Sequence, residues 1–159
     1  WFVLPLKKCQ SAPPPVPAAA GPVSAEQRLQ QAFAGKHILL AEDDPVNQEI
    51  SRSLLEHTGL LVTVAVDGAQ AVAMARQATY DLILMDVHMP LMNGLEATQA
   101  IRSDSPNRTT PIIALTASAF DDDRSACLAA GMNGHIGKPV DPDLLYAALL
   151  DWLERTPRR

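Results

Sequence analysis

The sequence predicts an α/β fold: a doubly wound, five-stranded parallel sheet with helices on both faces, of the flavodoxin-like type. Short, continuously apolar runs alternate with segments of helical period from residue 36 onward. With 159 residues, the chain is long enough for one domain of ordinary size with a sizeable core. Right-handed crossovers between successive parallel strands then place helices on both sides of the sheet.

Most of the expected strands are short runs in which apolar residues follow one another. Such runs are typical of parallel strands that are buried on both faces. The expected strands are residues 37–42, 60–66, 81–86, 111–117 and 134–138.

The first two helices between the strands are marked by spacing and by one glycine. Val46, Ile50 and Leu54 repeat at intervals of four, and Gly59 follows where a helix end favours glycine. Small apolar residues indicate the second helix, at Met74, Ala75 and Ala78.

The remaining helices are indicated by apolar spacing and by residues that favour helix ends. Ala97 and Ile101 mark one, and residues 121–131 begin with acidic side chains that suit a helix N-terminus. The last helix has Asp141 as its N-cap, Pro142 in its first turn and one apolar face. That face consists of Leu145, Ala148, Leu149, Trp152 and Leu153.

The composition of the chain changes before this domain begins. Residues 11–23 hold five of the thirteen prolines and no charge, which favours an extended linker. We therefore expect a Pro/Ala-rich linker over 11–35, with a short helix capped by Ser24, then the domain over 36–155 and a tail over 156–159. The chain also begins without Met, so we expect it to be a piece of a longer protein.

Composition and charge exclude several classes of function. A net charge of −5 gives no basic footprint, so we expect no direct nucleic-acid partner. We expect no membrane segment, since no apolar run is long enough to span one, and the first six residues are too short for a signal peptide. Cys9 and Cys127 lie outside any metal or redox spacing, which predicts reduced thiols and a cytoplasmic location.

Polar residues that carry chemistry stand where the expected strands end. The first strand ends at Glu42 and Asp43, the third at Asp86, the fourth at Thr116 and the fifth at Lys138. Ligands of doubly wound sheets bind beyond these carboxyl ends. Clustered carboxylates cannot all stay ionised without a counter-charge, so either their pKa values rise or a cation binds. An oxygen-only cluster predicts Mg²⁺.

This arrangement is suited to phosphoryl transfer. Mg²⁺ can bind the oxygens of an incoming phosphoryl group and offset the charge that they share with an attacking carboxylate. Asp86, with its second oxygen free, can then act as the nucleophile and form an acyl phosphate. Lys138 supplies a positive charge for a phosphoryl oxygen, and Thr116 supplies a hydroxyl donor.

Four blocks of the sequence resemble one known family, the receiver domain of two-component response regulators and hybrid sensor histidine kinases. They are "ILLAEDDPVNQ", "LILMDVHMPLMNGLEA", "IIALTASA" and "GMNGHIGKPVD", in the order of the family and within residues 36–153. The residues of these blocks are most similar to those of receivers attached to hybrid histidine kinases. The resemblance implies a phosphorelay function and the receiver type of the doubly wound fold.

The resemblance also implies roles for residues of the acidic cluster. Asp86 would be the phospho-acceptor, Asp43 a direct Mg²⁺ ligand and Glu42 an acidic partner acting through water. His88 would contribute its backbone carbonyl to the metal, so its imidazole need not take part.

Lys138, Thr116 and His135 would form the responding part of the site. By the same resemblance, Lys138 pairs with Asp86 and later with the phosphoryl group. Thr116 swings toward that group, and the side chain at the switch position, here His135, follows it inward. Many members carry Tyr or Phe at this position, so His135 implies a weaker or pH-sensitive switch. Asp44, where hybrid-kinase receivers often have Asn, would add negative charge near the metal.

The expected partners follow from the family. They are the phosphohistidine donor domain of a histidine kinase and, in a hybrid kinase, a histidine phosphotransfer domain. "WFVLPL" resembles the final strand of the ATP-binding domain of histidine kinases, so residues 1–10 are interpreted as the tail of such a domain. By the same resemblance, the parent protein would be a sensor kinase in the inner membrane. This piece is expected to catalyse only its own phosphorylation and dephosphorylation.

Three alternatives remain open. A small Mg²⁺-dependent phosphatase with an aspartyl-phosphate nucleophile would normally want a second acid two residues after Asp86, where His88 stands. A flavodoxin-like FMN carrier would need a Ser/Thr/Gly-rich loop after the first strand, and "EDDPVNQ" would repel its phosphate. A receiver used only for binding would lack some chemical groups, whereas here all are present.

Overall fold

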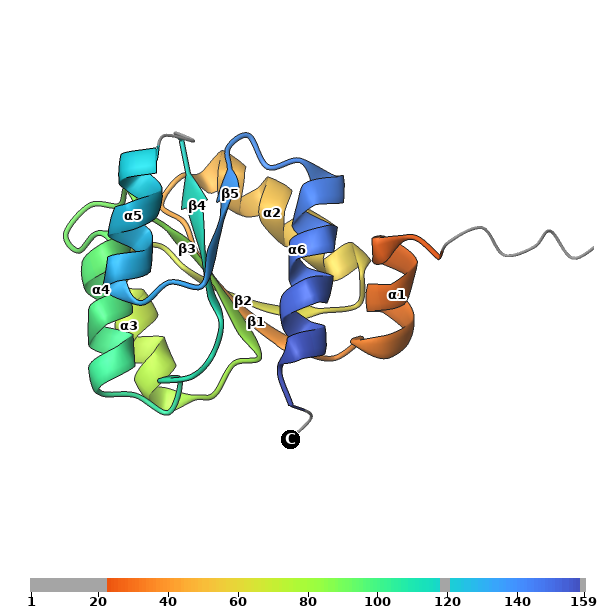
Figure 1. Ribbon diagram of the computed structural model, residues 1–159, viewed down its shortest axis with the longest axis horizontal. Coiled ribbons are helices and arrows are strands. Elements are labelled where there is room, and N and C mark those ends of the chain that lie inside the picture. The colour runs from red at the N-terminus through yellow and green to blue at the C-terminus, as the bar shows by residue number, and fades with distance from the viewer. Residues whose placement is uncertain (1–22, 118–120, 158–159) are drawn as a thin grey trace, which may run out of the picture.

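The computed structural model describes residues 23–117 and 121–157, in which helices and strands alternate (Figure 1). The order along the chain is α1 (Ala25–Ala32), β1 (His37–Ala41), α2 (Pro45–His57), β2 (Leu61–Ala65), α3 (Gly68–Gln77), β3 (Leu82–Asp86), α4 (Gly94–Ser103), β4 (Ile112–Thr116), α5 (Asp121–Ala130), β5 (Gly134–Gly137) and α6 (Pro142–Arg155).

All five strands pair in parallel, in the order β2-β1-β3-β4-β5. This is a doubly wound order, and it confirms the predicted fold class. Figure 1 shows α3, α4 and α5 on one face of the sheet and α1, α2 and α6 on the other. The carboxyl ends of β1, β3 and β4 therefore lie side by side.

The core has two layers, one on each face of the sheet, because successive strand residues point to opposite sides. Leu39 and Ala41 of β1 pack in the layer under α3, α4 and α5. Ile38 and Leu40 pack in the layer under α1, α2 and α6. Strands that are buried in both directions explain the unbroken apolar runs of the sequence.

Two aspartates fix the helices that begin beside the predicted site. Asp44 Oδ1 accepts the backbone N–H groups of Val46 and Asn47 at 2.8 and 3.2 Å, and Asp141 caps α6 in the same way. A side chain that accepts N–H groups of the first turn stabilises a helix by about 1 kcal/mol. Asp44, predicted as an added charge near the metal, thus serves as the N-cap of α2.

The buried face of α2 differs from the stripe that marked the helix in the sequence. Val46 is 67% exposed and Ile50 is also exposed, whereas Ser51 and Leu55 face the core. The four-residue repeat identified the helix correctly but not the side that packs on the sheet. Two large apolar side chains are therefore left at the surface, close to where α2 begins.

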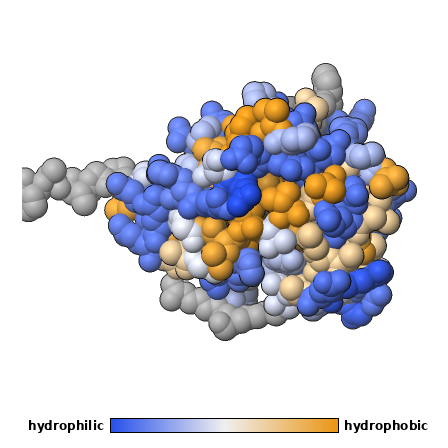
Figure 2. All heavy atoms as spheres, turned by 180° about the vertical axis from the view of Figure 1, so that it is seen from behind, coloured by the Kyte–Doolittle hydropathy of each residue, from blue (hydrophilic) through white to orange (hydrophobic). Residues whose placement is uncertain are grey.

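The surface mixes polar and apolar groups. Figure 2 shows separate apolar patches among hydrophilic residues on the face seen from behind. Within residues 23–117 and 121–157, no helix combines the length and the apolar character needed to cross a membrane.

Candidate functional site

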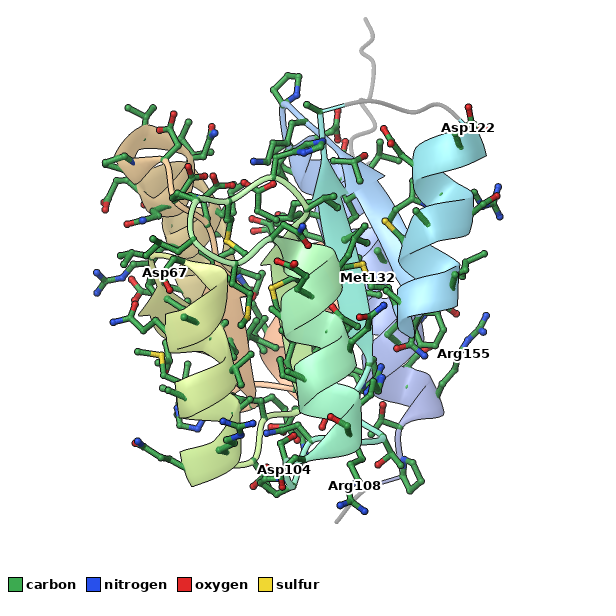
Figure 3. All side chains as sticks on the ribbon, turned by 90° about the vertical axis from the view of Figure 1, so that its left-hand side faces the viewer. Asp67, Asp104, Arg108, Asp122, Met132 and Arg155 are labelled. Atoms are coloured by element: carbon green, nitrogen blue, oxygen red, sulfur yellow. The ribbon has the colours of Figure 1, made fainter. Side chains whose placement is uncertain are left out.

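Three carboxylates meet at the carboxyl edge of the sheet. Glu42 directly follows β1, Asp43 comes next, and Asp86 is the last residue of β3. One oxygen from each lies within 4.8 Å of the others. In Figure 3 this is the upper edge, where Asp122 lies, while Asp104 lies at the opposite edge. The strand ends bring together the acids that the sequence predicted.

Lys138 joins two of these acids. Its Nζ lies 2.8 Å from Asp86 Oδ2 and 2.8 Å from Glu42 Oε2. The pairing with Asp86 is the one that the sequence predicts, whereas the pairing with Glu42 is not. The backbone N–H of Lys138 also donates to the carbonyl oxygen of Thr116 at 2.7 Å, which fixes the loop after β5 against the end of β4.

Two of the carboxylates are almost completely buried: Glu42 is 1% exposed and Asp86 is 3% exposed. Burial disfavours the charged form of a carboxylate. Burial, with the neighbouring charge of Asp86, raises the pKa of Glu42 above its ordinary value, although Lys138 acts in the opposite direction. Burial by itself lowers the pKa of Lys138, but its hydrogen bonds to Asp86 and Glu42 outweigh this and leave that pKa raised. One ammonium thus holds two buried carboxylates and stays charged at neutral pH.

The second oxygen of Asp86 is not free, which corrects the expectation from the sequence. Oδ1 accepts the backbone N–H of His88 at 3.0 Å. The His88 side chain is exposed, and its backbone contacts Asp86. Both oxygens of Asp86 are therefore oriented by hydrogen bonds.

Thr116 and His135 occupy different surroundings. Thr116 is buried at the end of β4, one residue beyond Leu115, the register partner of Asp86. His135 lies in the middle of β5 opposite Ala114, and its side chain is exposed. A cavity of about 50 Å³ beside His135 is lined also by residues of α5. The structure thus brings Thr116 to the acidic edge and leaves His135 at the surface.

Gly94 contributes a contact that sequence reasoning missed. A Cβ atom at this position would lie 2.1 Å from the carbonyl oxygen of Asp86, and the Gly94 N–H donates to the Val87 carbonyl at 2.9 Å. Only glycine allows α4 to begin this close to Asp86. The glycine that ends "MPLMNG" is the signal in the sequence for this close approach.

The model of the response regulator receiver domain family matches residues 38–150. The chain belongs to this family.

Two proteins of Pseudomonas aeruginosa illustrate the similarity. The sensor histidine kinase AruS of Pseudomonas aeruginosa is 46% identical over 114 residues, covering 70% of this chain and 11% of that protein. The receiver domain of the sensor histidine kinase PA1611 from the same species is 45% identical, with a TM-score of 0.72 over 76% of this chain and 99% of that one. Its crystal structure has a magnesium ion coordinated in the active site cleft.

A third similarity concerns a complex. A chain in the co-crystal structure of the Saccharomyces cerevisiae histidine phosphotransfer protein Ypd1 with the receiver domain of Ssk1 is 30% identical, with a TM-score of 0.69. The match covers 76% of this chain and 90% of that chain. Since the receiver spans only about a tenth of the length of AruS, the activity of a whole kinase does not transfer to it from similarity.

Proposed function

We propose that this receiver takes a phosphoryl group from a phosphohistidine donor onto Asp86 in a Mg²⁺-dependent step of a phosphorelay. The observation that carries the proposal is the arrangement around Asp86. A buried carboxylate at a strand end has an ammonium 2.8 Å away and two further carboxylates within 4.8 Å. Such a site can hold a cation and a phosphoryl group side by side.

The residues fit Mg²⁺. Hard carboxylate oxygens are the ligands this ion prefers, and it usually retains several waters. Asp43 is exposed and suited to direct coordination, whereas the buried Glu42 is suited to holding a metal-bound water. Asp86 and the backbone carbonyl of His88 would complete the protein ligands. When bound, Mg²⁺ would offset the negative charge on the phosphoryl oxygens.

The transfer step follows from the contacts of Asp86. One carboxylate oxygen forms a bond to phosphorus while the phosphorus–nitrogen bond of the donor breaks, and the imidazole nitrogen keeps the electron pair. Lys138 exchanges its carboxylate partner for a phosphoryl oxygen, and the Thr116 hydroxyl donates to another. Attack of water on the same phosphorus later releases phosphate and restores the Asp86 carboxylate.

Exposed apolar side chains around the site support a protein donor. Val46 and Ile50 lie on the outer face of α2, directly after the acidic residues, and Leu91 in the loop after β3 is 90% exposed. Apolar groups at the surface beside a functional site mark contact with another protein. We assign this surface to the phosphohistidine donor domain of a kinase and to a histidine phosphotransfer domain.

The wider context belongs to the same proposal. We place the receiver in the cytoplasm, within a hybrid histidine kinase whose ATP-binding domain ends at residues 1–10. These residues, and most of the proline-rich segment that follows, lie outside the described part of the chain. Within the described part, the buried thiol of Cys127 is unpaired, as a reducing compartment allows.

The first test is intact mass after incubation with acetyl phosphate, with Mg²⁺ or with EDTA. We expect a gain of one phosphoryl group that requires Mg²⁺ and disappears in Asp86→Asn. Asp151→Asn, an exposed aspartate on α6, serves as the control and should gain the group normally. A folded wild type that gains nothing would contradict acceptor chemistry and favour a receiver that only binds.

A second test separates chemistry from partner contact. Ile50→Glu should slow transfer from a phosphorylated histidine protein at least tenfold and leave the reaction with acetyl phosphate unchanged. Ser53→Glu adds the same charge at another exposed position of α2 and should have a much smaller effect. Equal effects of the two variants would exclude the apolar surface as the docking site.

A further inference from the structure

Helix α1 is built into the receiver, although it precedes the residues that the family model matches. Ser24 caps it, with Gln27 completing a capping box in which each side chain accepts the other residue's backbone N–H. Leu29 is fully buried and Phe33 is 6% exposed, both in the core layer that also contains α6. Helix α1 is therefore part of the folded unit, whereas the sequence predicted a linker as far as residue 35.

This helix contacts two other helices at the same time. Glu26 Oε1 lies 2.9 Å from His57 Nε2, and the Gln30 amide donates to the His57 carbonyl at 3.1 Å, both at the C-terminal end of α2. Arg28 forms an ion pair with Glu154 near the C-terminal end of α6. Figure 1 shows α1 lying alongside α6. α1 therefore bridges the far ends of α2 and α6.

The near ends of the same helices are joined at the phosphorylation site. Glu42 precedes α2 and accepts the Gln48 amide through its carbonyl oxygen at 2.7 Å. Lys138 precedes α6, whose N-cap Asp141 comes three residues later. The contact of 2.8 Å between Glu42 and Lys138 thus connects the starts of α2 and α6. One connection lies in the site, α1 forms another at the far ends, and between them the Tyr146 hydroxyl of α6 donates to the Leu54 carbonyl of α2 at 3.1 Å.

We propose that α1 docking and occupancy of Asp86 depend on each other through α2 and α6. This inference rests on the proposed function. When Lys138 turns to a phosphoryl oxygen, it leaves Glu42, and the connection between the starts of the two helices is lost. α6 can then shift against α2, and the shift strains the contacts that α1 makes to both at their other ends.

The core layer offers a direct path for this shift. Val140, two residues after Lys138, packs against the same layer as Leu29 and Phe33. Because energetic coupling between two sites is reciprocal, displacement of α1 from upstream must in turn change the affinity of the Asp86 site. Residues preceding Ser24 would thereby sense, and influence, the phosphorylation state.

Hydrogen exchange of the full chain tests the forward direction. Beryllium trifluoride with Mg²⁺ imitates the acyl phosphate without hydrolysis. We expect the amides of α1 to exchange about five times faster or more when it is bound, within the roughly 5–150-fold range of typical couplings. The α3 amides, on the opposite face of the sheet, serve as the internal control and should not change.

The outcomes separate this inference from the proposed function. Unchanged exchange of residues 87–93 would mean that beryllium trifluoride does not bind, and the proposed function would fail. Altered exchange there with unchanged α1 would overturn only the coupling.

The reverse direction uses a core variant in α1. Leu29→Ala should tighten beryllium trifluoride binding severalfold, because weaker docking favours the occupied state. Gln31→Ala, on the exposed side of the same helix, should leave the affinity unchanged. If Leu29→Ala lowers the melting temperature but not the dissociation constant, α1 is only structural. If Leu29→Ala does not fold, Arg28→Ala should show a smaller shift in the same direction, and no shift would refute the coupling.

Discussion

Replacing Lys138 by methionine should make the stability of the receiver depend more strongly on Mg²⁺ than that of the wild type, because the ion alone can then offset the buried carboxylates. Methionine keeps the apolar stem and removes the ammonium that lies 2.8 Å from both Asp86 and Glu42. Two carboxylates that are at least 97% buried then face each other without a cation. An uncompensated buried charge is among the few changes that destabilise a protein strongly.

The magnitude follows from burial. Removing one partner of a buried ion pair costs about 3–5 kcal/mol. The Lys138 side chain keeps 18% exposure, so water still screens the pair, and we take the lower end, about 3 kcal/mol. With a urea m-value of about 1.5 kcal/mol/M, the midpoint of unfolding should fall by about 2 M in EDTA. At a Mg²⁺ concentration of one hundred times the dissociation constant, binding returns about 2.7 kcal/mol.

The assay is urea unfolding of wild type and Lys138→Met, each in EDTA and in Mg²⁺, at pH 7.5 and pH 4.5. The pKa of Glu42 is raised by folding from its ordinary 4.5, so its cost is absent below 4.5 and grows as the pH rises toward the folded pKa. Lys138 is one of the influences that lower this pKa. The difference between the two proteins in EDTA should therefore be smaller at pH 4.5.

Two results would refute this reasoning. One is a loss below about 1 kcal/mol in EDTA, which would place the pair in the range of surface ion pairs. The other is a loss that is the same in EDTA and in Mg²⁺, which would mean that removing the ammonium does not increase the stabilisation by the ion. A control with Lys36→Met, whose ion pair with Asp81 is longer and more exposed, should lose little stability, and that loss should be the same in EDTA and in Mg²⁺.

Three further changes have defined outcomes. Glu42→Gln should raise the melting temperature in EDTA at pH 7.5, have no effect near pH 4.5 and weaken the Mg²⁺-induced rise, as followed by thermal unfolding. Gly94→Ala should cost about 3 kcal/mol and slow phosphorylation by acetyl phosphate, since its Cβ would meet the Asp86 carbonyl at 2.1 Å. Asn107→Ala should cost about 3 kcal/mol in urea unfolding without affecting phosphorylation, because its buried amide donates to two carbonyls at the end of α3 and accepts the Tyr80 N–H.

The sheet and the acidic edge could be predicted because they depend on local signals. A strand that is buried on both faces has to be apolar throughout, so its ends show in the sequence to within a residue. The predicted run 81–86, for example, corresponds to β3 at Leu82–Asp86. Because parallel strands end at the same edge, the residues that follow them must meet there, whatever the details of packing.

The buried face of α2 and the docking of α1 could not be predicted because they depend on contacts far apart in the chain. Val46 and Ile50 have the spacing of a core stripe, yet the sheet contacts Ser51 and Leu55 on the other side. In α1 only Leu29 is buried, and the rest of its sequence is polar enough to read as a linker. The sequence of neither helix indicates which part of the domain the helix packs against.

The pairing of Lys138 with Glu42 changes how the site is understood, because it gives the lysine a role before phosphorylation. Three carboxylates and one ammonium leave two negative charges at the strand ends when all are ionised, which is the charge that one divalent cation balances. Lys138 by itself can neutralise only one acid, so it holds the buried pair together without saturating the site. As a phosphoryl group adds further negative charge, Mg²⁺ has to be bound for Lys138 to leave Glu42 without exposing a buried carboxylate to uncompensated repulsion. Metal binding should therefore precede the exchange of partners by Lys138, and the lysine sets the order of events at Asp86.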